Sequence, residues 1–340
     1  MCRWGRGISG SLGAFLALAL ATSASFAQSG ADFYKGKTVI YIVATSPGGG
    51  YDLYGRLISE YMQKYLPGST FVVKNMPGAG HLIGTNAIYA ARPDGLTIGT
   101  FNTGLIYNQL IGHENSKFDL TKMSWVGKAS TEPRVFAIAE QSPIKTWADL
   151  KAQKEPVNFA TSGPGSANYN EIHMLMKVLK LPIKILTGYN GNDDTLAMRR
   201  GEVIGGMGSR SSFDPFIKNG YGRYIAQIGG NDKDVPQLSS FVTEPTAKQF
   251  IALIQAQGDI ARLTAGPPGI PKEQLDALRD AYRKAMEDKE LQAKAEKMER
   301  PVEPGYGDDV LKQVKAALNQ SPEIIALLKE SLKEPAPATK

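Results

Sequence analysis

From residue 38 onward the chain repeats one local pattern, in which a run of β-branched and apolar residues leads into a glycine-bearing turn and then an amphipathic helix. The first run covers residues 38–43 and ends before the glycines of residues 48–50, after which apolar residues recur at helical spacing as far as Tyr65. Four later runs predict strands of the same kind, at residues 71–73, 96–100, 157–160 and 183–186. Because strands that alternate with helices form right-handed βαβ units, the pattern predicts an α/β fold with mostly parallel sheets flanked by helices.

The pattern occurs in two sets, which extended runs around residues 125–127 and 134–139 connect. Two such sets predict two α/β domains that face each other across a cleft. We expect residues 28–139 to begin the first domain and residues 140–228 to form the second. Residues 229–334 are expected to return to the first domain and to supply C-terminal helices that pack across both.

The first 27 residues have the features of an export signal. Arg3 and Arg6 precede an apolar stretch that is too short to span a bilayer, and a small-x-small pattern ends at Ala27. We therefore expect residues 1–27 to be a signal peptide that is cleaved after Ala27, and the mature protein to act in the periplasm. At the other end, residues 335–340 are rich in proline and alanine and predict a flexible tail.

The composition argues against several kinds of chemistry. The chain has 39 Lys+Arg and 33 Asp+Glu with no long basic run, so nucleic acid is not an expected partner. A single cysteine, Cys2, and three widely spaced histidines argue against thiol catalysis, a metal site and a disulfide framework. No G-x-S-x-G motif marks a nucleophile, and the glycine spacing of residues 78–84 is not followed by a convincing ribose-binding acid. We expect no cofactor and no catalytic residues.

Four glycine-bearing turns follow predicted strands and precede predicted helices, at residues 48–50, 78–80, 163–165 and 188–191. In an open α/β sheet such turns lie at the carboxyl ends of the strands, where ligands bind. Glycine allows the backbone to approach a ligand closely, and the N–H groups and dipole of the next helix favour a carboxylate or phosphate. The sequence therefore predicts a cleft lined with anion-binding loops.

Three segments carry a resemblance to a known family: Pro47-Gly48-Gly49-Gly50-Tyr51-Asp52, Asn75-Met76-Pro77-Gly78-Ala79-Gly80 and Pro93-Asp94-Gly95-Leu96-Thr97. In this order and at this separation they resemble the Bug (TctC-like) proteins, which are periplasmic solute-binding receptors of tripartite tricarboxylate transporters. The resemblance implies a two-domain periplasmic-binding-protein fold of type II, a Venus flytrap, that closes on a small carboxylate. It also implies membrane transporter subunits as partners, and we expect the receptor to be a monomer and not an enzyme.

The resemblance implies ligand contacts from both domains. The first domain is expected to contribute Ser46, Gly48, Gly49, Asp52, Ala79, Gly80 and, as a further polar side chain, Thr103. The second domain is expected to contribute Ser162, Gly165, Ser166, Tyr189, Asn190 and Gly191. No residue is expected to bind a metal.

The chain departs from the family at two places that bear on the far end of the ligand. Ser209 and Arg210 stand where relatives usually have an Asp-Asn-like pair, and Arg210 could pair with a second carboxylate. Asn192, Asp193 and Asp194 stand where relatives tend to be small or apolar, and these acids could favour a cationic or hydroxylated group. The sequence leaves both possibilities open.

The leading hypothesis is therefore a periplasmic receptor for a small organic acid: a di- or tricarboxylate, an amino acid or an aromatic acid. Two alternatives have a compatible sequence pattern. One is a periplasmic ligand sensor that docks on a signalling receptor, and the other is a secreted α/β hydrolase.

Overall fold

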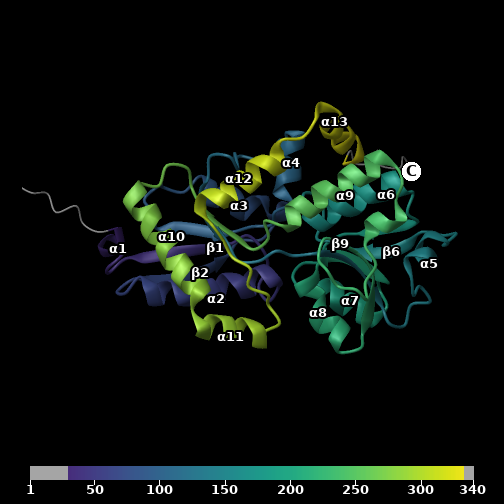
Figure 1. Ribbon diagram of the computed structural model, residues 1–340, viewed down its shortest axis with the longest axis horizontal. Coiled ribbons are helices and arrows are strands. Elements are labelled where there is room, and N and C mark those ends of the chain that lie inside the picture. The colour runs from purple at the N-terminus through teal and green to yellow at the C-terminus, as the bar shows by residue number, and fades with distance from the viewer. Residues whose placement is uncertain (1–29, 333–340) are drawn as a thin grey trace, which may run out of the picture.

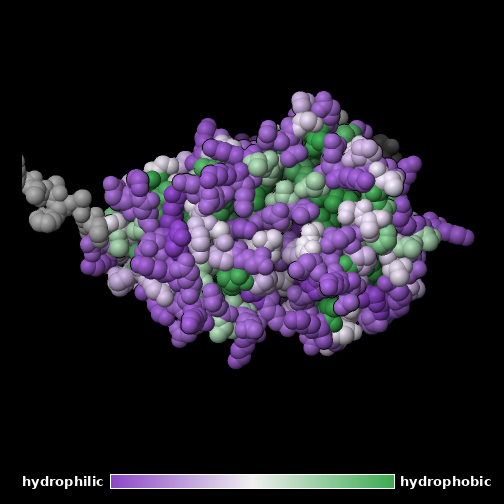
Figure 2. Space-filling model, viewed as in Figure 1, coloured by the Kyte–Doolittle hydropathy of each residue, from purple (hydrophilic) through white to green (hydrophobic). Residues whose placement is uncertain are grey.

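The computed structural model describes residues 30–332, so the predicted signal peptide at residues 1–27 and the predicted tail at residues 335–340 lie outside the described part of the chain. Two β-sheets, each flanked by helices, lie side by side along the long axis of the molecule (Figure 1). Hydrophilic side chains predominate on the face shown in Figure 2, and apolar ones are scattered over it. Within residues 30–332, no helix is long and apolar enough to cross a membrane.

The first sheet has the strand order β11-β4-β10-β3-β1-β2. Its strands are β1 (Thr38–Val43), β2 (Thr70–Asn75), β3 (Thr97–Thr100), β4 (Ser124–Lys128), β10 (Leu263–Gly266) and β11 (Gly305–Tyr306). The second sheet has the order β7-β6-β8-β5-β9. Its strands are β5 (Arg134–Ala139), β6 (Val157–Ala160), β7 (Ile183–Leu186), β8 (Gly205–Ser209) and β9 (Gly222–Ile228).

Both sheets are mixed, whereas the sequence pattern predicted mostly parallel sheets. Strand β1 pairs in parallel with β2 and β3, and β6 pairs in parallel with β7 and β8. In contrast, β10 is antiparallel to β3 and β4, and β5 is antiparallel to β8 and β9. The antiparallel strands β5 and β10 are those that follow the two crossings between the sheets. The α/β class is as predicted, and the crossings account for the mixture.

Helices cover both faces of each sheet (Figure 1). Those that accompany the first sheet are α1 (Gly30–Phe33), α2 (Gly50–Tyr65), α3 (Leu82–Tyr89), α4 (Leu105–Ile111), α10 (Lys272–Glu287), α11 (Lys289–Lys297) and α12 (Gly307–Leu318). Those that accompany the second are α5 (Trp147–Lys151), α6 (Ala167–Leu179), α7 (Asp193–Arg200), α8 (Arg210–Lys218), α9 (Pro245–Gly258) and α13 (Pro322–Ser331). Two short 3₁₀ turns, η1 (Ala79–His81) and η2 (Leu238–Phe241), complete the described elements.

Strand β1 shows why both faces of the first sheet need a cover. Val39, Tyr41 and Val43 point to one side and pack in the apolar cluster that includes α2 and α10. Ile42 points to the other side and packs in the cluster that includes α3, α4 and α12. Because successive side chains of a strand alternate between faces, a strand with a continuous apolar run must have both of its faces buried. This explains the continuous apolar run at residues 38–43.

The chain crosses between the sheets at other places than the sequence pattern predicted. Strand β5 belongs to the second sheet, so the first crossing lies between Lys128 and Arg134, and residues 134–139 are not part of the first unit. Helix α9 packs on α6, β5 and β9, so the return lies between Gly258 and Leu263 and not at residue 229. Apolar runs stand on both sides of the first crossing, so the sequence did not indicate that the chain passes from the first sheet to the second there. Helices α12 and α13 each contact helices of both units.

Candidate ligand-binding site

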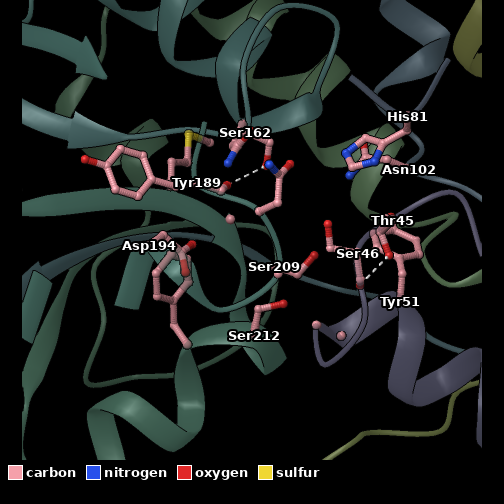
Figure 3. A pocket seen from close by; sticks show the side chains of 18 of the residues that line it. Thr45, Ser46, Tyr51, His81, Asn102, Ser162, Tyr189, Asp194, Ser209 and Ser212 are labelled. Atoms are coloured by element: carbon pink, nitrogen blue, oxygen red, sulfur yellow. Dashed lines mark hydrogen bonds between the residues drawn. The ribbon is translucent and has the colours of Figure 1, made fainter. Parts of the chain in front are cut away.

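A cavity of about 90 Å³, called the inner cavity below, lies between the two units, where the carboxyl ends of β1 and β3 face those of β6 and β7. A second cavity of about 300 Å³ adjoins it beside residues 77–81 and shares several lining residues with it. In Figure 3, Ser46, Tyr51 and His81 lie on the first unit's side, and Ser162 and Tyr189 lie on the opposite side. We refer to the two cavities together as the cleft.

The structure brings most of the predicted ligand-binding residues to the cleft. Seven of them line the inner cavity: Ser46, Gly49, Ser162, Tyr189, Asn190, Gly191 and Ser209. Ala79 and Gly80 line the adjoining cavity. These nine residues come from five separate loops, so the predicted position of the loops at the carboxyl ends of the strands holds in the structure.

Six predicted residues do not line the cleft. Gly48 and Asp52 bond to each other behind the first loop, and Thr103 is buried against the side chain of Gln257. A Cβ atom on Gly165 would lie 3.2 Å from the side chain of Asn108, so this residue packs against the first unit. The hydroxyl of Ser166 donates to the carbonyl of Gly163 at 2.6 Å. None of these five residues lines either cavity.

Arg210 is the sixth residue and the clearest correction. Its guanidinium bonds to Asp232 at 2.5 Å and to Asp214 at 3.4 Å, and it faces a separate groove that also contains Arg300. Helix α8 begins at this residue, and the helical turn directs the side chain away from the cleft. Arg210 is therefore not placed to pair with a ligand carboxylate in the cleft.

The cleft contains residues that the sequence analysis did not select. The largest are two arginines, Arg134 and Arg262, and the others include Tyr51, Asn102 and Ser212. The arginines stand at the two crossings between the sheets, and their acidic partners lie 37 and 130 residues away in the sequence. No local pattern links partners at that separation, so a single sequence carried no signal for them.

Four helices begin at the cleft. The cavity is lined by Gly49 and Gly50 at the start of α2, by Asn168 of α6, by Asp194 of α7, and by Ser209 before α8. The residues at the four N-cap positions make no side-chain capping bond, although three of them are Ser166, Asn192 and Ser209. Serine and asparagine ordinarily cap a helix by accepting from its first N–H groups. The positive ends of the four helices face one space, but at α8 the N–H of Ser211 already donates to the carboxylate of Glu132 at 3.2 Å. The ends of α2, α6 and α7 are therefore the ones that would stabilise a further anion in this space.

The loop before α3 has an unusual backbone. Four successive residues, Gly78, Ala79, Gly80 and His81, have φ values of +122°, +46°, +60° and +78°. Left-handed backbone is costly for residues with a Cβ atom, so this turn is held in place by its surroundings. A Cβ atom on Gly80 would lie 2.2 Å from the carbonyl oxygen of Pro164 on the opposite unit. The glycine thus permits the loop to meet the second unit.

Asp52 holds two loops of the cleft together. Its carboxylate accepts from the N–H of Gly48 at 2.9 Å, from Arg56 at 3.0 Å and from the side chain of Asn75 at 2.8 Å. Asn75 also donates to the carbonyl of Thr45. Burial raises the pKa of Asp52, but the three hydrogen bonds outweigh it and lower the pKa below its ordinary value. Asp52 is thus an ionised positioning residue.

The two sides of the cleft touch at its rim. Asn192 donates through its side chain to the carbonyl of Gly48 at 3.1 Å. A Cβ atom on Gly49 would lie 2.9 Å from the Cα atom of Gly191. These contacts join the start of α2 to the start of α7, so the structure shows the cleft closed.

Two buried ion pairs form the floor of the cleft. Arg134 bonds to Glu171 and also donates to the hydroxyl of Ser209 at 3.0 Å. Arg262 bonds to Glu132 at 3.1 Å. All four charged side chains of these pairs are at most 5% exposed. Because each charge has a partner, burying them is tolerated, and the pairs fix the position of groups that line the cavity.

Two titratable side chains line the walls of the cleft. Burial lowers the pKa of His81, whose Nδ1 lies 3.0 Å from the carbonyl of Ala44. Since a carbonyl only accepts, Nδ1 carries the proton and Nε2 is left as an acceptor. Asp194 has a pKa raised to about 6 by burial and by repulsion from Asp193. Within residues 30–332, no group of histidine, cysteine or acidic residues could hold a metal ion.

Residues 55–329 match the sequence profile of the Tripartite tricarboxylate transporter family receptor, TctC. The match begins within α2 and ends within α13, so it includes every described strand except β1. The chain belongs to this family. Members of the family are periplasmic binding proteins that work with transporter subunits, and this TctC-family chain is a solute-binding receptor and not an enzyme.

Known proteins resemble the receptor over most of its length. The UPF0065 protein in the gbd 5'region of Cupriavidus necator is 23% identical over 282 residues, which cover 79% of this chain and 80% of that protein. The solved structure of the periplasmic binding protein BugD has a TM-score of 0.73 at 20% identity, and the alignment covers 88% of this chain and 98% of that one.

Two other solved structures contain ligands. MatC from Rhodopseudomonas palustris with bound malate has a TM-score of 0.68 at 19% identity, covering 87% of this chain and 99% of that one. An R. palustris protein with adipate has a TM-score of 0.69 at 18% identity, covering 86% of this chain and 97% of that one. At this identity the likeness shows the fold, which is the two-domain periplasmic-binding-protein fold that the sequence resemblance implied.

Proposed function

We propose that this receptor captures a small organic carboxylate in the cleft and delivers it to the membrane subunits of a tripartite tricarboxylate transporter. The convergence of the N-termini of α2, α6 and α7 on one closed cavity carries the proposal. Each of these N-termini offers N–H groups and a positive dipole end, which suit a carboxylate better than a neutral or cationic group.

The family relationship supports the same ligand class. Malate and adipate are the ligands in two proteins of the same fold, and both are small dicarboxylates. The nine predicted loop residues that line the cleft provide hydroxyl, amide and main-chain groups that suit carboxylate oxygens.

We further propose that the protein is exported with residues 1–27 as a signal peptide, is cleaved after Ala27 and acts in the periplasm as a monomer. Residues 1–27 have the charged, apolar and small-residue segments that signal peptidase recognises. N-terminal sequencing of a periplasmic extract should find Gln28 as the first residue. Recovery of the chain from the cytoplasm with Met1 intact would contradict export.

A thermal-shift screen tests the carboxylate proposal. Mono-, di- and tricarboxylates, amino acids and aromatic acids are added to the purified mature chain, and native mass spectrometry identifies any ligand that copurifies. A carboxylate present at about 100 times its Kd should stabilise the folded state by about 2.7 kcal/mol, which is visible as a higher Tm. The proposal fails if no carboxylate raises the Tm and native mass spectrometry finds no acid.

Transport is tested separately from binding. Membrane vesicles that contain the cognate transporter subunits should take up the identified acid only when the ligand-loaded receptor is added. If the receptor binds the acid but uptake does not depend on the receptor, the ligand-sensor alternative is favoured instead.

A further inference from the structure

Arg262 occupies an unusual position at the floor of the cleft. It immediately precedes β10, lines the inner cavity and is only 1% exposed. Its φ angle is +57°, a left-handed backbone conformation that residues other than glycine and asparagine rarely adopt. Residues held in such conformations cluster at functional sites, because the surrounding structure must compensate for the strain.

The contacts of Arg262 hold the guanidinium in one orientation. Nε donates to Glu132 at 3.1 Å, and Nη2 donates to the hydroxyls of Ser211 at 3.0 Å and Ser212 at 3.3 Å. The ring of Tyr51 lies against it, with the guanidinium carbon 4.5 Å from the ring centroid. Among residues 30–332 the hydrogen bonds of Arg262 use Nε and Nη2, so Nη1 is a donor of a buried arginine that is left for the cavity.

A glycine keeps the space beside the guanidinium free of side-chain atoms. A Cβ atom on Gly50 would lie 2.8 Å from Nη2 and 3.0 Å from Nη1 of Arg262. Gly50 is also the first residue of α2, so the guanidinium lies beside a helix N-terminus that faces the cleft. Two positive groups from different elements therefore meet at this end of the cavity.

The charge around Arg262 is not balanced among the buried side chains. Arg300, 7% exposed, donates to the carbonyl of Ser211, and its pKa is lowered first by burial and then by the nearby charge of Arg262. Glu132 is the acid that these two buried guanidiniums share; Asp214 also faces Arg300, but it is half-buried and pairs with Arg210. An anion at Nη1 would offset the excess positive charge, which is costly to bury alone.

Resting on the proposed function, we propose that Arg262 and Ser212 form a subsite for a second carboxylate, so that the ligand is a small dicarboxylate. Nη1 donates to one oxygen of that carboxylate. Ser212 accepts from Nη2 and keeps its own O–H free to donate to the ligand, and it lines the same cavity. The first carboxylate lies at the helix N-termini near the rim.

Neither other arginine near the cleft serves this role. Arg210 faces away from the cleft and pairs with two aspartates. Arg134 uses Nε and Nη2 for Glu171 and Nη1 for Ser209, so each of its nitrogens already has a partner. Arg262 thus takes the role that the sequence left open for Arg210.

Calorimetry with matched acids tests the subsite. Succinate is compared with butyrate and adipate with hexanoate, because each pair differs only in the second carboxylate. The wild type should bind the better diacid at least about tenfold more tightly than its monoacid. Arg262→Gln should weaken diacid binding by about 10- to 100-fold, the loss expected for a hydrogen bond to a charged group, and leave monoacid binding within about threefold.

Arg300→Gln is the matched control, because Arg300 is a second buried arginine that bonds to Ser211, through its carbonyl, and does not line the cleft. It should lower the Tm and keep the diacid preference. Ser212→Ala, a milder change, should reduce the preference for the diacid over its monoacid several-fold. This variant tests the subsite even if Arg262→Gln does not fold.

The outcomes separate the two proposals. If no acid binds the wild type, the proposed carboxylate function fails. If monoacids bind as tightly as diacids, or if Arg262→Gln and Ser212→Ala leave the preference intact, carboxylate capture stands and the Arg262 subsite is overturned. An equal loss for both members of a pair in these two variants also overturns the subsite, because it assigns Arg262 a purely structural role.

Discussion

At residue 49 a glycine is needed because the two sides of the cleft approach each other there. Its φ and ψ of −81° and 172° are an ordinary extended conformation, so the turn itself would accept other residues. The constraint is the Cα atom of Gly191, which a Cβ atom at residue 49 would approach to 2.9 Å. Sequence reasoning identified the position but attributed it to the turn and to direct ligand contact.

Gly49→Ala should therefore hinder closure. Because a Cβ contact under 3.0 Å requires the opposite rim to move, we expect ligand affinity to fall at least about tenfold, with little change in the ligand-free Tm. Gly112→Ala is the control, since Gly112 has a φ of +68° and lies outside the cleft. It should lower the ligand-free Tm and leave the ligand-induced shift unchanged. If Gly49→Ala also retains the full ligand-induced shift, the rim contact does not matter for binding.

Asp194 should make the stability and the ligand affinity depend on pH. Its folded pKa of about 6 lies above the ordinary value of 3.8, so the unfolded chain releases this proton first as the pH rises. The cost to folding therefore appears above about pH 4 and is complete above about pH 6. Asp194→Asn should raise the free energy of unfolding by about 1–2 kcal/mol at pH 7.5 and leave it unchanged near pH 3.5.

The pH dependence of ligand affinity gives a second test of the role of Asp194. An ionised Asp194 repels an anionic ligand, so carboxylate binding by the wild type should tighten as the pH falls from 7.5 to 5.5, while Asp194→Asn should bind similarly at both values. Asp234→Asn, an exposed change outside the cleft, should behave like the wild type in both measurements. An Asp194→Asn variant with the wild-type pH profile would show that this carboxyl does not sense the ligand.

At the scale of elements, the predicted strands agree best where β-branched and aromatic residues are concentrated. The strands at residues 38–43, 157–160 and 183–186 have the predicted bounds, although only β1 is a continuous apolar run and Lys184 of the edge strand β7 is exposed. Strand β8 was missed because its sequence is Gly-Gly-Met-Gly-Ser, which has no β-branched residue. It forms a strand because glycines at 205 and 206 fit closely between β5 and β6. Such a tertiary requirement leaves no local pattern.

Asp52 connects the start of α2 to the end of β2, and its loss should loosen both loops. Asp52→Asn keeps the shape but cannot accept from the same three donors, so the free energy of unfolding should fall by about 1–3 kcal/mol and ligand binding should weaken. Because hydrogen bonds hold the pKa of Asp52 below its ordinary value, its contribution is present at neutral pH and is lost in acid. The difference from the wild type should therefore shrink below about pH 4.

Arg56→Ala is the control for this prediction. The side chain of Arg56 is 51% accessible, and its removal leaves the bonds of Asp52 to Gly48 and Asn75 in place. An exposed ion pair contributes at most about 1 kcal/mol, so this change should be small. Equal effects of Arg56→Ala and Asp52→Asn would show that the ion pair, and not the loop contacts, explains the role of Asp52.

At the scale of the whole molecule, the fold class and the cleft were predictable, but the connections between the two units were not. Glycine-bearing turns after strands predicted which loops meet, because parallel strands present their carboxyl ends at one edge. The arginines of the floor were not predictable, since Arg134 and Arg262 bond to acids that only the two crossings bring near. The direction of Arg210 depends on where α8 begins, which the sequence did not mark.

Closure of the two units should be measurable by small-angle X-ray scattering. A saturating dicarboxylate should reduce the radius of gyration of the wild type, because the rim contacts between α2 and α7 form on closure. Gly49→Ala should retain the larger radius with the same ligand. Tryptophan fluorescence is less suited, since Trp125 and Trp147 are buried in separate apolar clusters away from the cavity. An unchanged wild-type radius would contradict ligand-driven closure.

The most direct test of the central claim is a crystal structure of the mature receptor with the acid that raises its Tm most. The carboxylate should lie in the cavity between the two units, with oxygens about 2.7–3.0 Å from main-chain N–H groups at the start of α2 and of at least one helix of the second unit. A carboxylate bound outside this cavity, or one that contacts only a single unit, would contradict the proposal that converging helix N-termini capture the ligand.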